Sequence, residues 1–317
     1  MSLMRKWLKE AGRTIQKEKV TLGLERLEER ILLSVDMTVL GGSGTEADPY
    51  RIGSLAGLSW LTQHPEAWDA SYIQTADINA ATTQYWDDVD EDGDGDLYND
   101  PGDETSAGSN EGFRPIGYDI SSEWGFQGTK FVGTYNGQGH TIDGLTVRRG
   151  STDYVGLFGN MEYVTIENLG VTDVEISGNR YVGGLAGFNF YESPITNSYA
   201  TGSIAGGAGV GALVGGNVRS PITNSYAMAA VSGDSYVGGL VGANGYESTV
   251  TGSYATGSVS GGQVAGGLIG RNASNSTVNS SYATGSVTGD DDVGGLVGYN
   301  DDYSTVASSY ATGSVTG

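Results

Sequence analysis

A run of carboxylates is the part of the sequence best suited to binding a metal ion. Ten acidic side chains fall between Trp86 and Glu104, with no basic residue among them. Because like charges this close repel one another, cations that gather on the segment stabilise it. Alternate carboxylates with central glycines match the first half of a calcium loop, in which the side chains converge on one hard cation. The sequence therefore predicts a Ca²⁺ site made by Asp88, Asp90, Asp92, Asp94 and Asp96.

The acidic segment departs from an EF-hand in two respects. Asn99 or Pro101 stands where an EF-hand has its bidentate Glu, and no helical pattern flanks the loop. Two interpretations therefore stay open: a loop ordered by calcium without the EF-hand helices, and a solvated acidic loop.

The remaining residue types offer little for catalysis. The chain has no cysteine, which excludes disulfides, Cys-ligated zinc and thiol chemistry. Its two histidines, His64 and His140, belong to no zinc motif, and we expect a structural role for His140 at the start of a strand. The strongest enzyme hypothesis is a polysaccharide lyase, which would need a basic residue in a groove lined by carboxylates. The repeats described below offer three basic side chains, Arg180, Arg219 and Arg271.

Charge is distributed unevenly along the chain. Residues 1–36 carry eight of the 16 basic side chains but only six of the 38 acidic ones, so the remainder is strongly acidic. Because a negative net charge repels a phosphate backbone, nucleic-acid binding is excluded as an expected function. No run of 18 apolar residues occurs, so we expect no membrane-spanning helix.

The elements that must position these residues are set by an internal repeat. From Tyr154 to Gly317 a leucine recurs in steps of 28, 28, 27, 28 and 28 residues, and a tyrosine column keeps the same step to within one residue. The leucines are Leu157, Leu185, Leu213, Leu240, Leu268 and Leu296, and the tyrosines are Tyr199, Tyr226, Tyr254, Tyr282 and Tyr310.

Each repeat has the pattern of a β-helix coil. In the copy at 237–261, Leu240 and Val241 mark one strand, Val250 a second, and the stretch from Ala255 to Val259 a third, with glycines between them. Interior glycines and the absence of a 3.6-residue apolar period disfavour helix. The sequence therefore predicts an all-β fold, a right-handed parallel β-helix with coils of about 28 residues.

Equivalent residues of neighbouring coils should lie above one another. An asparagine column would then form a ladder of side-chain hydrogen bonds, and the tyrosine column would form a stack of rings. We expect both ladders to be structural, with a glycan-binding tyrosine stripe as the alternative. The asparagines are Asn189, Asn217, Asn244, Asn272 and Asn300.

Two stretches of the sequence resemble known bacterial families. The unit Val-Gly-Gly-Leu-Val-Gly-x-Asn, followed by Ser-Thr-Val-x-x-Ser-Tyr-Ala-Thr-Gly-Ser-Val, resembles the GLUG repeat in residues 237–261 and 293–317. The stretch Leu27-Glu28-Glu29-Arg30-Ile31-Leu32-Leu33-Ser34 resembles the LEPR-XLL motif of large bacterial surface proteins, with Glu29 in place of Pro. An amphipathic helix that docks on the domain is the alternative for this stretch. Together the resemblances imply a secreted or surface-attached bacterial protein.

Three regions follow from these patterns. Residues 1–36 form a helical, targeting-like segment, residues 37–149 form an irregular cap with the first coil or coils, and residues 150–317 form the GLUG β-helix. Within the second region, 131–142 is expected to open the solenoid, because Asn-Gly precedes alternating apolar residues there.

The predicted function is that of a non-enzymatic, adhesin-like binding or display stalk, with a β-helix carbohydrate-active enzyme as the alternative. Its expected partners are a surface protein or glycan of a host or neighbouring cell. The last repeat shows no cap, so we also expect a longer native product and self-association at the edge near Gly317.

Overall fold

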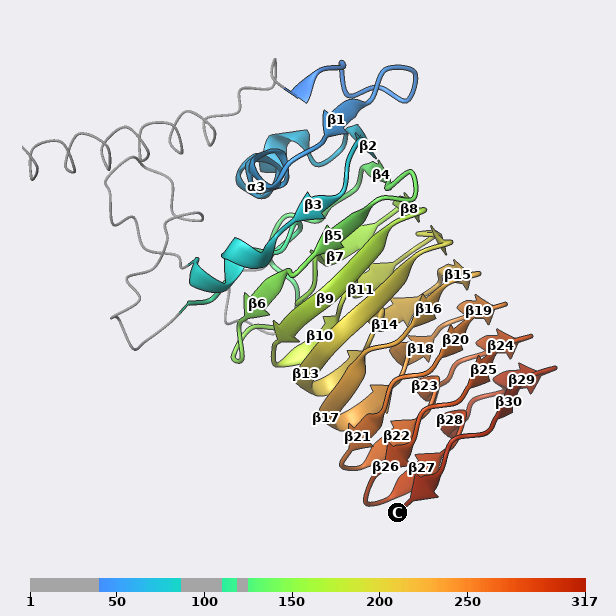
Figure 1. Cartoon of the computed structure of the whole chain (residues 1–317). Coiled ribbons are helices and arrows are strands. Elements are labelled where there is room, and N and C mark those ends of the chain that lie inside the picture. The colour runs from blue at the N-terminus through green and yellow to red at the C-terminus, as the bar shows by residue number, and fades with distance from the viewer. Residues whose placement is uncertain (1–39, 87–109, 119–124) are drawn as a thin grey trace, which may run out of the picture.

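The chain folds as a stack of short parallel strands. The computed structural model describes residues 40–86, 110–118 and 125–317. Residues 1–36, which were predicted to form a helical segment with the LEPR-XLL-like stretch, lie outside the described residues. Every pairing between named strands is parallel, and the coils follow one another from β1 at one end to β31 at the other (Figure 1). The predicted parallel β-solenoid is confirmed, with about seven turns of about 28 residues.

The first of three sheets has nine strands and joins the N-terminal region to the repeats. Alternate side chains along its strands are buried, as in Thr249–Thr251, where only Val250 faces the core. The strands, in spatial order, are β1 (Tyr50–Ile52), β2 (Ser71–Gln74), β4 (Thr134–Asn136), β8 (Thr165–Glu167), β12 (Ile195–Thr196), β15 (Pro221–Thr223), β19 (Thr249–Thr251), β24 (Thr277–Asn279) and β29 (Thr305–Ala307).

The second sheet has six strands and lies within the repeats. Its register aligns Val214 with Val241 and Val241 with Ile269, one coil apart. The strands, in spatial order, are β7 (Phe158–Glu162), β11 (Ala186–Phe190), β14 (Val214–Val218), β18 (Val241–Gly245), β23 (Ile269–Asn272) and β28 (Val297–Asn300).

The third sheet has sixteen strands and is the largest face in Figure 1. Its strands are β3 (Ile78–Asn79), β5 (Thr141–Asp143), β6 (Thr146–Arg148), β9 (Gly170–Ser177), β10 (Arg180–Gly183), β13 (Tyr199–Gly211), β16 (Tyr226–Ala227), β17 (Ala230–Gly238), β20 (Tyr254–Ala255), β21 (Val259–Gly261), β22 (Val264–Gly266), β25 (Tyr282–Ala283), β26 (Val287–Thr288), β27 (Asp292–Gly294), β30 (Tyr310–Ala311) and β31 (Val315–Thr316).

The stretch predicted as one strand from Ala255 to Val259 is two strands, β20 and β21. Between them the α-carbon of Gly257 packs so closely on the preceding coil that a Cβ there would lie 1.8 Å from the carbonyl oxygen of Ala229. This close approach interrupts the strand and draws the chain inward.

The solenoid begins earlier than the predicted first coil at 131–142. Strand β1 pairs with β2, with Tyr50 beside Tyr72, and β2 pairs with β4, with Tyr72 beside Tyr135. Sequence analysis missed them because these coils lack the glycine pattern of the later repeats. Tyr72 and Tyr135 fill the core in place of Val and Ile.

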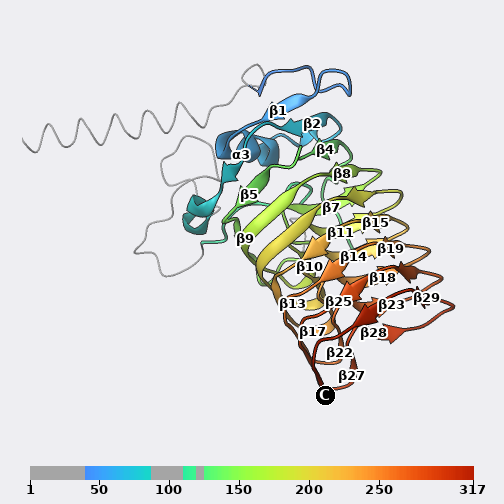
Figure 2. The same cartoon turned by 45° about the vertical axis from the view of Figure 1, so that its right-hand side comes forward.

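Helix α3 (Leu55–Gln63) lies beside the first strands at the N-terminal end of the stack (Figures 1 and 2). Its N-cap Ser54 accepts a hydrogen bond from the backbone N–H of Gly57 at 3.2 Å. The helix buries Leu58, Trp60 and Leu61, which cover the open end of the core. Two short 3₁₀ helices, η1 (Pro65–Ala67) and η2 (Ala81–Tyr85), complete this region.

Polar ladders run through the interior of the stack. The side-chain nitrogen Nδ2 of Asn189, Asn217, Asn244 and Asn272 donates to Oδ1 of the next asparagine at 2.8–2.9 Å. The predicted asparagine hydrogen bonds are confirmed. Two serine columns add similar bonds, in which a backbone N–H donates to the Oγ one coil on, as in Ser248 to Ser276 at 3.2 Å. These bonds satisfy polar groups that would otherwise be costly to bury.

The coil at residues 290–317 is less covered than those before it. Val306 is 41% exposed and Val315 is 47% exposed, whereas Val278 and Val287, one coil earlier, are buried. Its strands have a neighbour on one side within the described residues. The expected self-association at this edge stays a prediction.

Candidate binding surface

The segment that carries the predicted calcium ligands joins Trp86 to Asn110 in the sequence. Asp88, Asp90, Asp92, Asp94 and Asp96 lie in 87–109, outside the described residues. The residues on either side of this segment are in contact. The N–H of Gly112 donates to the carbonyl oxygen of Trp86 at 2.9 Å, and the centroids of the Trp86 and Phe113 rings lie 6.3 Å apart. Within 40–86, 110–118 and 125–317, no three His, Asp or Glu side chains gather to hold a metal ion.

We predict that Ca²⁺ binds the acidic loop. The expected result of calorimetry on the whole chain is heat of binding above the buffer control, with slower proteolysis near Gly93. Asp90→Asn with Asp92→Asn should abolish both effects, because each change removes a charged ligand. Asp290→Asn with Asp291→Asn, in a different acidic cluster, is the matched control for net charge. Equal heats from both double variants would contradict a site at this loop.

Both histidines are held by local contacts. The His64 ring stacks on Trp60 at a centroid distance of 3.9 Å, and its Nδ1 lies 2.8 Å from the Trp60 carbonyl oxygen. Nδ1 of His140 lies 3.2 Å from Oδ1 of Asp77, which also accepts the Thr141 backbone N–H at 2.9 Å. The backbone bond from Thr141 and then the His140 bond hold the pKa of Asp77 below its usual value. The His140–Asp77 pair therefore ties two coils together.

Arg219 and Arg271 pack on tyrosines at the surface. Arg219 lies 4.9 Å from the centroid of the Tyr191 ring, and its Nη1 donates to the Tyr191 hydroxyl at 2.6 Å. Arg271 lies over Tyr236, and its Nη2 is 3.0 Å from a carboxylate oxygen of Asp301. A second acid, Asp302, lies 4.0 Å from the same nitrogen. The guanidinium of Arg271 thus lies beside two carboxylates.

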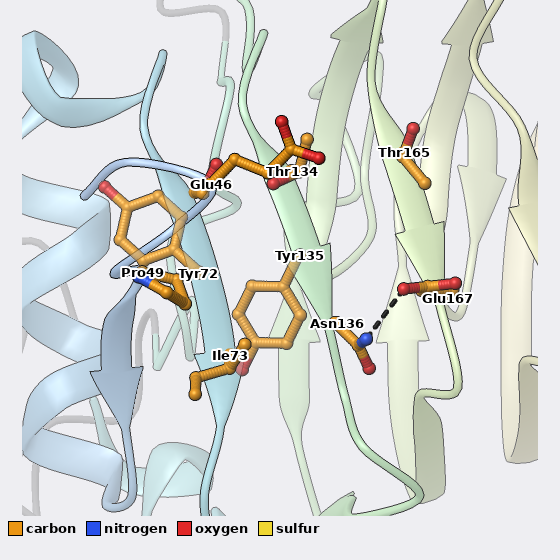
Figure 3. Close-up of a pocket in the computed structure, with 10 residues that line it drawn as sticks. Glu46, Pro49, Tyr72, Ile73, Thr134, Tyr135, Asn136, Thr165 and Glu167 are labelled. Carbon is orange, nitrogen blue, oxygen red and sulfur yellow. Dashed lines mark hydrogen bonds between the residues drawn. The ribbon is translucent and has the colours of Figure 1, made fainter. Parts of the chain in front are cut away.

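A hollow of about 370 Å³ opens where the cap meets the first coils (Figure 3). Its lining of described residues combines two carboxylates, five hydroxyl-bearing side chains, one amide and two apolar side chains, with no basic side chain among them. Those groups suit a small neutral ligand rich in hydroxyls. The ten lining residues are Glu46, Pro49, Ser71, Tyr72, Ile73, Thr134, Tyr135, Asn136, Thr165 and Glu167.

The wall of this hollow is fixed by hydrogen bonds. Nδ2 of Asn136 donates to Oε1 of Glu167 at 2.6 Å (Figure 3). Behind them, the Tyr135 hydroxyl donates to Oε1 of Gln74 at 3.2 Å, and the Tyr72 hydroxyl donates to the Ala67 carbonyl oxygen. Burial raises the pKa of both phenols well above the usual value, so they stay protonated donors. Sequence analysis missed this hollow because its residues come from three separate coils.

The tyrosine column forms a stack of five rings on the sixteen-stranded sheet. Successive centroids are 4.7, 4.9, 4.9 and 5.3 Å apart, and neighbouring planes differ by at most 7°. The predicted ring stack is confirmed. Tyr199 at one end lies beside Gly170, where a Cβ would come within 2.5 Å of the ring. Because the rings face one another, the stack presents ring edges to solvent rather than faces.

The stack should weaken the fold at high pH. Desolvation and the neighbouring phenols raise the pKa of Tyr226 and Tyr254 above the usual value of about 10. The folded state therefore keeps these protons when the unfolded state loses them, so their stabilising contribution is complete below the unfolded pKa. That contribution falls as pH rises toward the folded pKa.

In a pH titration followed by tyrosinate absorbance, the native chain should contain a group of tyrosines that ionises at higher pH than the tyrosines of the chain unfolded in urea. Tyr226→Phe with Tyr254→Phe should remove part of it, whereas Tyr85→Phe, outside the stack, should not. If both variants keep the same number of tyrosines that ionise at high pH, the prediction is contradicted.

The comparisons with known proteins match the repeats to one described motif. The model "The GLUG motif" fits residues 178–205, 233–260 and 291–316. These coils are GLUG motifs. The resemblance seen in 237–261 and 293–317 is therefore confirmed, and the matched segments coincide with coils that carry the asparagine and tyrosine ladders.

Two curated relatives match part of this chain and are much longer proteins. The chain is 36% identical over 178 residues to Halomucin of Haloquadratum walsbyi, which is 56% of this chain and 2% of Halomucin. It is 34% identical over 155 residues to a candidate Gly-rich membrane protein of Evansella cellulosilytica, 44% of this chain and 14% of that protein. The chain thus spans a small part of both relatives.

A solved structure shares the fold at low identity. The crystal structure of a candidate immunoglobulin A1 protease from Bacteroides ovatus superposes with a TM-score of 0.57 over 87% of this chain and 86% of that chain. The sequences are 17% identical. This likeness supports the β-helix fold alone. No helix among the described residues is long and apolar enough to cross a membrane.

Proposed function

We propose that this chain is part of a non-enzymatic bacterial surface protein whose GLUG solenoid acts as an adhesin-like stalk. The observation that carries the proposal is the register of the coils, which repeats the same partly exposed side chains at one strand spacing. A rod with repeated identical groups can engage a repetitive partner at several points, and the effective concentration of each further contact strengthens binding.

A surface location is supported by two independent observations. The two relatives carry the names Halomucin and Gly-rich membrane protein. The segment 1–36 has a basic helical pattern and the LEPR-XLL-like stretch, and we assign it a role in export. Secretion or attachment to the cell surface is the proposed location, with partners on a host or neighbouring cell.

Adhesion is tested with beads that carry the whole chain. The beads should be retained under flow on lawns of bacterial or epithelial cells, and beads coated with an unrelated acidic protein of equal charge density are the control. Retention should fall when the last coil, 290–317, is deleted, because fewer repeated contacts remain. Equal retention of coated and control beads would overturn the adhesin proposal.

The alternative function is that of a polysaccharide lyase, and the contact of Arg271 with Asp301 and Asp302 is the observation that favours it. The whole chain, incubated with polygalacturonate or alginate and Ca²⁺, would then release unsaturated products that absorb ultraviolet light. Arg271→Gln should abolish that absorbance if the arginine acts as the base. Product formation by the unmodified chain would replace the stalk proposal with the enzyme.

A further inference from the structure

One corner of the solenoid carries large side chains in an unfavourable backbone conformation. The turns between the six-stranded and nine-stranded sheets follow the ends of β7, β11, β14, β18 and β28, several of which are labelled in Figure 2. We call this corner the tyrosine edge; its residues are Tyr163, Tyr191, Arg219, Tyr246 and Tyr303. All five have a positive φ, between 45° and 60°. Non-glycine residues adopt this conformation at a cost in free energy.

The turn itself does not require tyrosine. At the corner between the nine-stranded and sixteen-stranded sheets, the same left-handed conformation is filled by Asn168, Asn197, Asn224, Gly252 and Ser280. Asparagine and glycine are the residue types that tolerate it best. At the corner of the tyrosine edge itself, the turn after β23 places Ser274 and Asn275 in the left-handed conformation, so this turn also forms without an aromatic side chain.

Packing does not require the rings of Tyr163, Tyr246 and Tyr303 either. Tyr163 is 60% exposed, Tyr246 is 58% exposed and Tyr303 is 93% exposed. Beneath the rings, the turn is secured by buried serines, such as Ser248, whose Oγ donates to the Gly245 carbonyl oxygen at 2.8 Å. By contrast, the ring of Tyr181, which has a positive φ within β10, packs against the Phe188 ring at a centroid distance of 4.8 Å. Strained residues that the fold does not need point to a binding role.

Part of the edge is already arranged for contact. The Tyr163 and Tyr191 rings lie 5.8 Å apart with planes tilted by 32°, so they do not cover each other as the stacked column does. Arg219 lies against the other side of Tyr191 and donates to its hydroxyl. The cluster therefore holds rigid aromatic surface beside hydroxyl and guanidinium donors, and rigid groups lose little entropy on binding.

From this geometry we propose that the tyrosine edge binds a neutral polysaccharide that lies along the solenoid axis. Sugar rings offer apolar C–H faces to aromatic side chains and hydroxyls to the neighbouring polar groups, among them the exposed Glu192 and Glu247. The net charge of −22 opposes an anionic chain. A single line of side chains cannot bury the roughly 800 Å² that a stable protein partner needs on each side, whereas an extended chain needs only a line of contacts.

The proposal rests on the surface-stalk function and names its ligand class. The test compares the whole chain with the triple variant Tyr163→Asn, Tyr246→Asn and Tyr303→Asn. Asparagine suits the left-handed conformation, so the variant should unfold in urea at the same or a higher concentration. Tyr199→Asn with Tyr226→Asn, in the stacked column, is the matched control.

Binding is measured by affinity electrophoresis in gels that contain mannan, dextran or hydroxyethylcellulose, with alginate as the anionic probe. The unmodified chain and the control should be retarded by at least one neutral polymer, and the triple variant should bind it at least about tenfold more weakly. Absence of retardation in every neutral gel, equal retardation of the triple variant, or retardation by alginate alone would overturn the proposal. Binding to a deglycosylated surface protein, with none to the polymers, would do the same.

The two proposals fail separately. If coated beads adhere to cells and the triple variant adheres equally, the stalk function stands and the tyrosine edge is not its site. If the edge retards the chain in neutral gels but coated beads do not adhere, the site stands and the adhesin function falls.

Discussion

Replacing Gly238 by alanine should destabilise the solenoid by about 3 kcal/mol or more, at the upper end of what overpacking costs. A Cβ at this position would lie 2.0 Å from the carbonyl oxygen of Val241 and 2.6 Å from the backbone nitrogen of Gly270. Both atoms belong to the backbone, so no side-chain rotation can relieve the contact. The shift must spread to the next coil, because Gly266 makes the same close approach to Ile269.

The matched control is Gly245→Ala in the same coil. There the nearest atom to a Cβ is the carbonyl oxygen of Ala273 at 4.0 Å, an ordinary contact distance. Urea unfolding followed by circular dichroism should show a large loss for Gly238→Ala and little change for Gly245→Ala. Similar midpoints for the two variants would show that the turn at Gly238 can relax, and the prediction would be wrong.

Removing one asparagine from the middle of the ladder should cost about 3 kcal/mol, because it strips partners from two buried groups at about 1–3 kcal/mol each. Asn244→Ala leaves Nδ2 of Asn217 without its side-chain acceptor and Oδ1 of Asn272 without its donor. Neither group is exposed to water that could replace the lost bond.

Asn300→Ala is the control variant, which distinguishes the effect of breaking the ladder from the effect of losing one side chain. Asn300 is exposed, accepts one bond from Asn272 and donates to the Ser304 carbonyl oxygen. Its removal should cost under about 1 kcal/mol, because water can reach the groups that it leaves. Hydrogen exchange should also rise locally around Asn217 and Asn272 in the first variant, since each coil of a solenoid is stabilised by its neighbours. Equal losses in both variants would contradict a cooperative interior ladder.

The fold was predictable because the same pattern of residues recurs in each repeat. Leucines or asparagines that recur at a 28-residue step are expected to lie above one another in successive coils. The register of β14, β18 and β23 confirms this arrangement. The first coils were harder to predict, since Tyr72 and Tyr135 occupy core positions without the glycine pattern around them. Strand pairing there depends on contacts between distant segments that no local pattern records.

The candidate sites were less predictable than the fold. The hollow beside Glu46 and Glu167 forms from separate coils, and its shape follows from their stacking. The tyrosine edge had a signal, because Tyr163, Tyr191 and Tyr246 recur ahead of the strands of the nine-stranded sheet. What sequence could not reveal was their positive φ and their exposure. Those two properties separate them from the stacked column, whose rings cover one another.

The parallel stacking also determines how the rod would respond to mechanical force. Hydrogen bonds between β18 and β23, like those between other neighbours, run from coil to coil, roughly along the axis of the stack. A pull on the end near Gly317 therefore loads the bonds of the outermost coil first and peels it away before the next. Each released coil of about 28 residues would add about 95 Å of extended chain. A solenoid built in this way would lengthen under tension in nearly equal steps and dissipate energy at each one.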